Sequence, residues 1–179
     1  MTNREKTWPL AGFTSLSPIA IGGLAGLLAV RGTPSMGVDW SAIAILAVAL
    51  LALGASLLHL GRPFRAYRAM ARVFTSWLSR EVVLYGLFVI LLAVYALPIQ
   101  SSSWDRSRGL LGVLASLVGG VSLWVTGQVY RLPSRPAWNH QRTIASLILG
   151  ALGAGFLLGY GVGRPMHGDG TNLPSYEKA

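Results

Sequence analysis

Two ionisable residues, His59 and Glu81, stand at the edges of long apolar runs of the sequence. An imidazole accepts a proton near neutral pH, and a carboxylate can pass a proton on as a general base. We therefore predict that His59 and Glu81 could together take protons from a reduced quinol, with Arg62 and Trp77 as neighbouring quinol-binding residues. Each of the pair also has a simpler explanation, because His59 could cap a helix end and Glu81 would be stabilised by the dipole of a helix N-terminus.

The segment between this pair is rich in arginine. On a helix, four of these arginines fall within a sector of about 120°: Arg62, Arg65, Arg68 and Arg72. The opposing face collects apolar residues: Phe64, Tyr67, Ala71, Phe74 and Leu78. This pattern predicts an amphipathic connector helix lying in a membrane interface. Its arginines could contact lipid phosphates, or they and Arg80 could dock an acidic soluble subunit, since planar guanidinium groups suit carboxylates.

Composition narrows the classes of function. The 179 residues include no cysteine, which excludes a disulfide framework and Cys-ligated zinc or iron–sulfur clusters in this chain. The net charge of +9 could suggest a nucleic-acid partner, but the charges cluster between apolar runs. No nucleophilic triad or phosphate-binding loop is recognisable, and we predict no metal site in this chain.

The elements that must position the candidate residues are membrane spans. Hydrophobic residues make up 53% of the chain and charged residues 12%, too few to cover a water-facing surface. Five apolar stretches each approach the roughly 20 residues that a helix needs to cross a bilayer: 10–30, 40–60, 82–97, 110–129 and 144–163. We predict an all-α, polytopic transmembrane helix bundle over residues 1–163, followed by a polar C-terminal tail at 164–179. Trp77 would then belong to an aromatic belt at the membrane surface, or its ring could stack on a quinone.

Glycine spacing predicts close helix packing within this bundle. Gly22 and Gly26 form one G-x-x-x-G motif, Gly155, Gly159 and Gly163 form a double one, and Ser116 and Gly120 form a related pair. Such spacing lets helices approach closely in lipid, and packing within one bundle is favoured over a dedicated dimer face. Most basic residues fall on the side that carries the N-terminus, His59 and Glu81, so the distribution of charge predicts that this side is cytoplasmic.

At these residues the sequence resembles the membrane-anchor subunit of dimethyl sulfoxide reductase and related molybdoenzymes, the DmsC family. The strongest match covers Leu58-His59-Leu60-Gly61-Arg62-Pro63 and Ser76-Trp77-Leu78-Ser79-Arg80-Glu81, with further matches near Trp8-Pro9-Leu10 and Tyr130-Arg131-Leu132-Pro133. The resemblance runs from about residue 7 to residue 163. Family members usually have more spans than the five predicted here, and the polar tail is expected to be a true terminus.

The resemblance implies a subunit of the plasma (inner) membrane of a prokaryote that serves anaerobic respiration. It would oxidise menaquinol or another quinol and pass the electrons to an iron–sulfur subunit, which in turn serves a catalytic subunit bearing molybdopterin. In the family, the histidine and the acid of these motifs, here His59 and Glu81, are associated with quinol binding or oxidation. The family topology places the motif side outside the cytoplasm, against the distribution of charge.

Two other classes stay open. A haem-bearing cytochrome could use His59 and His140 as axial ligands, although His140 lies in a loop rich in proline and arginine. A structural or assembly module would hold the complex without turning over quinol. Transport is disfavoured because the spans contain few charges, and helix–helix hydrogen bonding explains Thr126 and Gln128.

Overall fold

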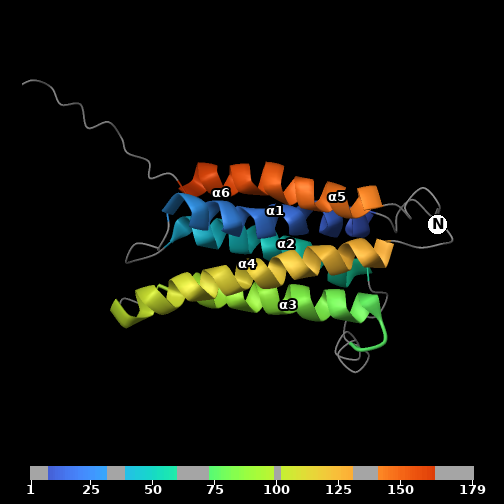
Figure 1. Cartoon of the computed structure of the whole chain (residues 1–179), viewed down its shortest axis with the longest axis horizontal. Coiled ribbons are helices and arrows are strands. Elements are labelled where there is room, and N and C mark those ends of the chain that lie inside the picture. Colours follow the sequence, from blue (N-terminus) through green and yellow to red (C-terminus); the bar gives the residue numbers. More distant parts are fainter. Residues whose placement is uncertain (1–7, 32–38, 60–72, 99–101, 131–140, 164–179) are drawn as a thin grey trace, which may run out of the picture.

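The computed structural model describes residues 8–31, 39–59, 73–98, 102–130 and 141–163. Their secondary structure is helical: α1 (Trp8–Arg31), α2 (Trp40–His59), α3 (Trp77–Tyr95), α4 (Ser102–Tyr130), α5 (Gln141–Gly150), the π-helical turn η3 (Ala151–Gly155) and α6 (Phe156–Gly163). The last three follow one another without a break and form a single long helix (Figure 1). The prediction of an all-α bundle is confirmed.

Five helical stretches are long and apolar enough to cross a membrane, as predicted. Large apolar side chains point outward from the bundle, among them Leu51, Leu110 and Leu157. An exposed apolar surface of this kind is stable in contact with lipid rather than with water. The chain is therefore a multi-pass membrane protein.

The helices form two groups that meet along α4. In Figure 1, α3 and α4 lie side by side, while α1 and α2 pack together with the α5–α6 helix against α1. Successive spans run antiparallel, so the start of α3 and the ends of α2 and α4 share one face of the membrane. We call this face side A, and the opposite face, where α2 begins and α3 ends, side B. The buried core includes Phe13, Leu24, Ile45, Phe88 and Leu92.

The glycines of α1 and of the last helix contact each other directly. A Cβ atom added at Gly22 would overlap the carbonyl oxygen of Ala151, and one added at Gly159 would overlap that of Gly23. Only glycine permits such an approach between the two backbones. The π-helical turn coincides with this crossing. Gly120, in contrast, has open space where its Cβ would be, so the prediction that this glycine packs closely within the bundle is wrong.

Two helices begin earlier than predicted. α3 begins at Trp77 instead of Val82, because Ser76 acts as its N-cap and accepts a hydrogen bond from the backbone N–H of Ser79 at 3.5 Å. α4 begins at Ser102 instead of Leu110. The predicted connector helix does not continue through residues 73–76: Val73–Thr75 form a turn and Ser76 has extended backbone angles. The rest of the connector, with Arg62, Arg65, Arg68 and Arg72, lies outside the described residues, as does the tail at 164–179.

Candidate functional site

Glu81 lies about one turn inside α3 and is almost completely buried, with 5% of its surface exposed. The Ser76 cap sets this position, because it starts the helix one turn before the carboxylate. A buried carboxylate is costly unless polar groups compensate it or it has a function. Glu81 is therefore the centre of the candidate site.

Glu81 faces a small apolar cavity near side A. Three helices line the cavity, with Phe13 from α1, Leu53, Ser56 and Leu57 from α2, and Glu81, Val82 and Tyr85 from α3. The lining offers one carboxylate and two hydroxyl groups among apolar side chains, which suits an apolar molecule with a polar edge.

Polar contacts hold the walls of this cavity. The Tyr85 hydroxyl donates to the carbonyl oxygen of Ala49 at 3.1 Å, which joins α3 to α2. The Tyr85 ring meets that of Phe13 edge to face, with centroids 5.1 Å apart. The Glu81 carboxylate accepts a hydrogen bond from the Thr126 side chain of α4, whereas its Oε1 atom has no hydrogen-bond partner within the described part of the chain. One carboxylate oxygen of this cavity-lining residue is therefore buried without a hydrogen-bond partner among the described residues.

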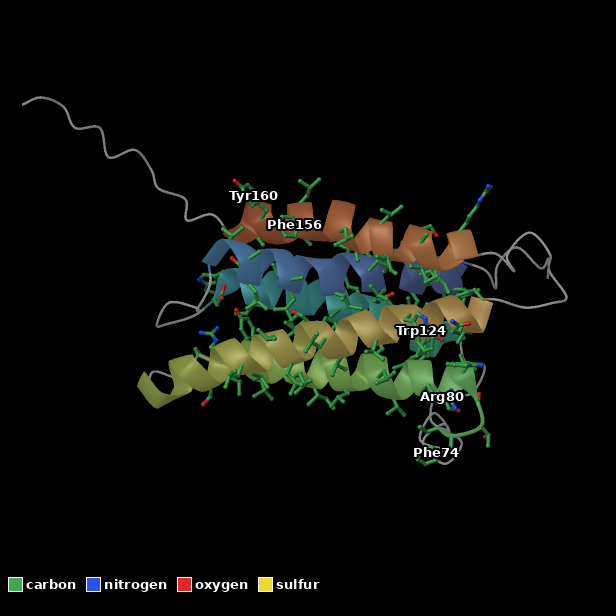
Figure 2. All side chains as sticks on the ribbon, in the orientation of Figure 1. Phe74, Arg80, Trp124, Phe156 and Tyr160 are labelled. Carbon is green, nitrogen blue, oxygen red and sulfur yellow. The ribbon has the colours of Figure 1, made fainter. Side chains whose placement is uncertain are left out.

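Trp77 and Arg80 lie beside the cavity and do not line it. The Trp77 ring packs edge to face on Trp124, with centroids 5.7 Å apart, and the guanidinium carbon of Arg80 lies 4.4 Å from the centroid of Trp77. Arg80 also donates hydrogen bonds to the carbonyl oxygens of Val73 at 2.9 Å and Phe74 at 2.8 Å. Figure 2 shows Arg80, Phe74 and Trp124 near one end of the bundle. Arg80 thus fastens the end of the connector to the first turn of α3.

The other predicted site residues are placed only in part. α2 ends at His59, shortly after the cavity-lining Leu57, but the His59 side chain lies outside the described residues. The four connector arginines lie outside them too. The structure thus brings Glu81 to the cavity and places the end of α2 beside it.

Most of the residues that line the cavity were not predicted from the sequence. Tyr85 follows Glu81 by one helical turn, and this spacing could have marked it as a neighbour on the same face. Phe13 and Ser56 gave no local signal, because their role depends on how α1 and α2 pack. Across the described segments, no three His, Cys, Asp or Glu side chains gather as a possible metal site.

Comparison with known proteins relates the chain to one family. The sequence model for the DMSO reductase anchor subunit (DmsC) matches residues 1–175. The C component of the anaerobic dimethyl sulfoxide reductase of Haemophilus influenzae is 31% identical over 159 residues, which are 85% of this chain and 57% of that protein.

Two further relatives match comparable parts. The YnfH component of an anaerobic dimethyl sulfoxide reductase of Escherichia coli is 27% identical over 88% of this chain and 58% of its own length. The C component of the sulfite dehydrogenase of Allochromatium vinosum is 30% identical over 72% of this chain and 44% of its own length. The chain thus spans about half the length of these relatives, and no solved structure matches it. On the strength of the match along nearly its whole length, the chain belongs to the family of DMSO reductase anchor subunits.

Proposed function

We propose that the chain is the quinol-oxidising membrane anchor of a multi-subunit molybdoenzyme in the plasma membrane of a prokaryote. Residues 1–163 would form the anchor bundle, with 164–179 as a polar tail. The observation that carries the proposal is the buried Glu81 carboxylate, whose Oε1 atom lies without a described partner beside an apolar cavity. Family membership and the names of the relatives support it.

In this proposal a quinol, menaquinol or another, enters the cavity with its hydroxyl group toward Glu81. The O–H bond breaks, the proton passes to Oε1 of Glu81, and an electron leaves for the partner. A second proton and a second electron follow, so that the quinol becomes a quinone. His59, at the end of α2, would accept the second proton. The apolar walls formed by Phe13, Leu53 and Tyr85 suit the ring of a quinol.

The electrons must leave the chain, because it contains no cysteine to hold iron–sulfur clusters. We assign those clusters to an iron–sulfur partner subunit and the molybdopterin to a catalytic subunit. These partners would dock on side A through Arg62, Arg65, Arg68 and Arg72. Arg80 contributes less to docking, because its guanidinium already donates to Val73 and Phe74. The side that docks the partners would lie outside the cytoplasm, as in the family topology.

The test is Glu81→Gln in membranes that contain the assembled complex. The amide keeps the size of the side chain but cannot accept the proton, so electron transfer from a reduced naphthoquinone to the partner should fall by about 100-fold or more. Reduced methyl viologen, which delivers electrons directly to the partner subunits, should still support turnover. Val83→Ala on the same turn of α3, outside the cavity lining, is the matched control.

Normal quinol-driven turnover in Glu81→Gln would overturn the proposal and favour an anchor that holds the complex without handling quinol. This second function is a candidate because the chain covers only about half of the length of each relative. Equal losses with both electron donors would show damage to assembly, which the amount of complex recovered from the membrane would confirm.

A further inference from the structure

Glu81 lies between two different environments. On one side is the apolar cavity, and on the other is the helix α4, from which Thr126 reaches the carboxylate. Thr126 is itself buried, with 1% of its surface exposed. Its hydroxyl is thus shielded from water, and the hydrogen bond to Glu81 is a contact inside the protein.

The packing of α3 on α4 fixes this contact. A Cβ atom added at Gly119 would lie 3.1 Å from the ring of Phe88, and one added at Gly112 would lie 3.0 Å from the ring of Tyr95. At the side A end, Trp77 of α3 meets Trp124 of α4. Aromatic side chains of α3 therefore contact α4 along most of their shared length. These contacts fix the position of Thr126 along the helix axis relative to Glu81.

We propose that Thr126 is a positioning residue for Glu81, whose hydroxyl holds the carboxylate in place beside the cavity and keeps it ready to accept a proton. This inference rests on the proposed quinol oxidation. A threonine hydroxyl that donates to a carboxylate stabilises its ionised, proton-accepting form. Without that donor, the ionised carboxylate would be left in an apolar site and would also be free to rotate.

Among the described side chains, two titratable tyrosines lie near Glu81, and α2 ends at His59 beside the same cavity. Tyr85 of α3 lines the same cavity and donates to Ala49, and Tyr130 of α4 interacts electrostatically with Glu81. α1 contributes Phe13 to this region and α2 contributes Ser56, neither of which titrates. Ordinary tyrosines stay protonated near neutral pH, so the hydroxyl of Thr126 is the contact to change.

The experiment compares Thr126→Val, which keeps the shape of the side chain and removes the hydroxyl, with Thr126→Ser, which keeps the hydroxyl. In the assembled complex, Thr126→Val should lower kcat with a reduced naphthoquinone about 10-fold. It should also move the acid limb of the pH–rate profile to higher pH by about one unit, since the ionised carboxylate loses its donor. KM should change less than kcat, and Thr126→Ser should stay near the wild type.

Ser122→Ala is the matched control for loss of a buried hydroxyl. Ser122 lies one turn from Thr126 on α4, is equally buried, and its hydroxyl has no partner among the described side chains. It should leave the pH–rate profile unchanged. If Thr126→Val accumulates poorly, Thr126→Ala carries the same expectation.

Three results would overturn the inference. An unchanged rate and pH profile in Thr126→Val would show that the hydroxyl does not act on Glu81. Equal loss in Thr126→Val and Thr126→Ser with an unchanged pH profile would show a packing role. A shift in Ser122→Ala as large as that in Thr126→Val would show a general effect of polarity. Failure of the proposed function would give a different result from failure of this inference, because Glu81→Gln would then retain quinol-driven turnover.

Discussion

Arg108 and Asp39 form a buried ion pair at side B, with Nη2 of the arginine 3.8 Å from Oδ2 of the aspartate and exposures of 1% and 3%. Oδ1 of Asp39 accepts the backbone N–H groups of Ser41 at 3.1 Å and Ala42 at 3.2 Å, which caps the start of α2. Nε of Arg108 donates to the carbonyl oxygen of Tyr95 at 2.7 Å, at the end of α3. This pair therefore joins α2, α3 and α4 at the membrane face opposite Glu81.

Removal of one partner of this pair should be strongly destabilising. Asp39→Leu leaves the Arg108 guanidinium buried without its counter-charge, and Arg108→Leu does the same to Asp39. Each should lower the free energy of unfolding by about 3–5 kcal/mol. Thermal or denaturant unfolding in detergent micelles would measure the effect.

The double variant Asp39→Leu/Arg108→Leu separates charge from packing. Because it removes both charges, it should be more stable than the sum of the two single effects predicts. Strict additivity of the two losses would contradict the ion-pair explanation and leave only the cap of α2 and the contact with Tyr95.

Two neighbouring glycines of α6 should respond oppositely to alanine. At Gly159 the new Cβ would overlap the carbonyl oxygen of Gly23, so Gly159→Ala must push α6 away from α1 and should cost about 1–3 kcal/mol. At Gly161 the space is open, and Gly161→Ala should be neutral or stabilising by up to about 1 kcal/mol. Unfolding in detergent would compare them, and equal effects would show that the close crossing is absent.

Arg80→Lys should release the turn that precedes α3. The planar guanidinium reaches two carbonyl oxygens, those of Val73 and Phe74, and covers the ring of Trp77. A lysine ammonium cannot reproduce this fork. Limited proteolysis at Phe74, which is 90% exposed, should be several-fold faster than in the wild type, while Arg142→Lys, at an exposed arginine of α5, should leave that rate unchanged. An unaltered cleavage rate in Arg80→Lys would show that contacts other than those of Arg80 hold the turn in place.

His59→Leu should abolish electron transfer from quinol while the complex stays assembled. α2 ends at His59 soon after Leu57, which lines the cavity with Glu81. Quinol-dependent reduction of the partner measures the loss, and Leu58→Ala, at an exposed apolar neighbour, is the control. Full turnover in His59→Leu would assign both protons of the quinol to Glu81 or to other groups.

The sequence was sufficient for features that depend on local composition. Apolar runs predicted the five helices, and Glu81 stood out as an acid at the edge of one of them. The ion pair was not predicted, because Asp39 and Arg108 are far apart in the chain and Arg108 precedes the apolar stretch 110–129 that was predicted as a span. α4 begins at Ser102 instead, and this earlier start carries Arg108 into the helix and into the interior.

Thr126 shows a second limit of sequence reasoning. Its hydroxyl was expected to join two helices, and it does so, but its partner could not be identified without the register of α3 on α4. The same register determines which glycines lie in a helix contact. Gly119 faces Ile21 and Phe88, whereas the adjacent Gly120 faces open space. A shift of one residue rotates a helix position by about 100°, so spacing alone does not show which of two adjacent glycines lies in a contact.

The crossing of α1 with the last helix has a consequence for the order of assembly. α1 is synthesised first, but its glycine face is covered by residues of η3 and α6. At a synthesis rate of about 5–20 residues per second, Gly163 follows Arg31 by roughly 7–26 s. During that interval α1 can pair with α2 while its glycine surface faces lipid or the insertion machinery. Bundle closure is therefore a late step that waits for the fifth span, and slowing translation before residue 141 would prolong the open intermediate.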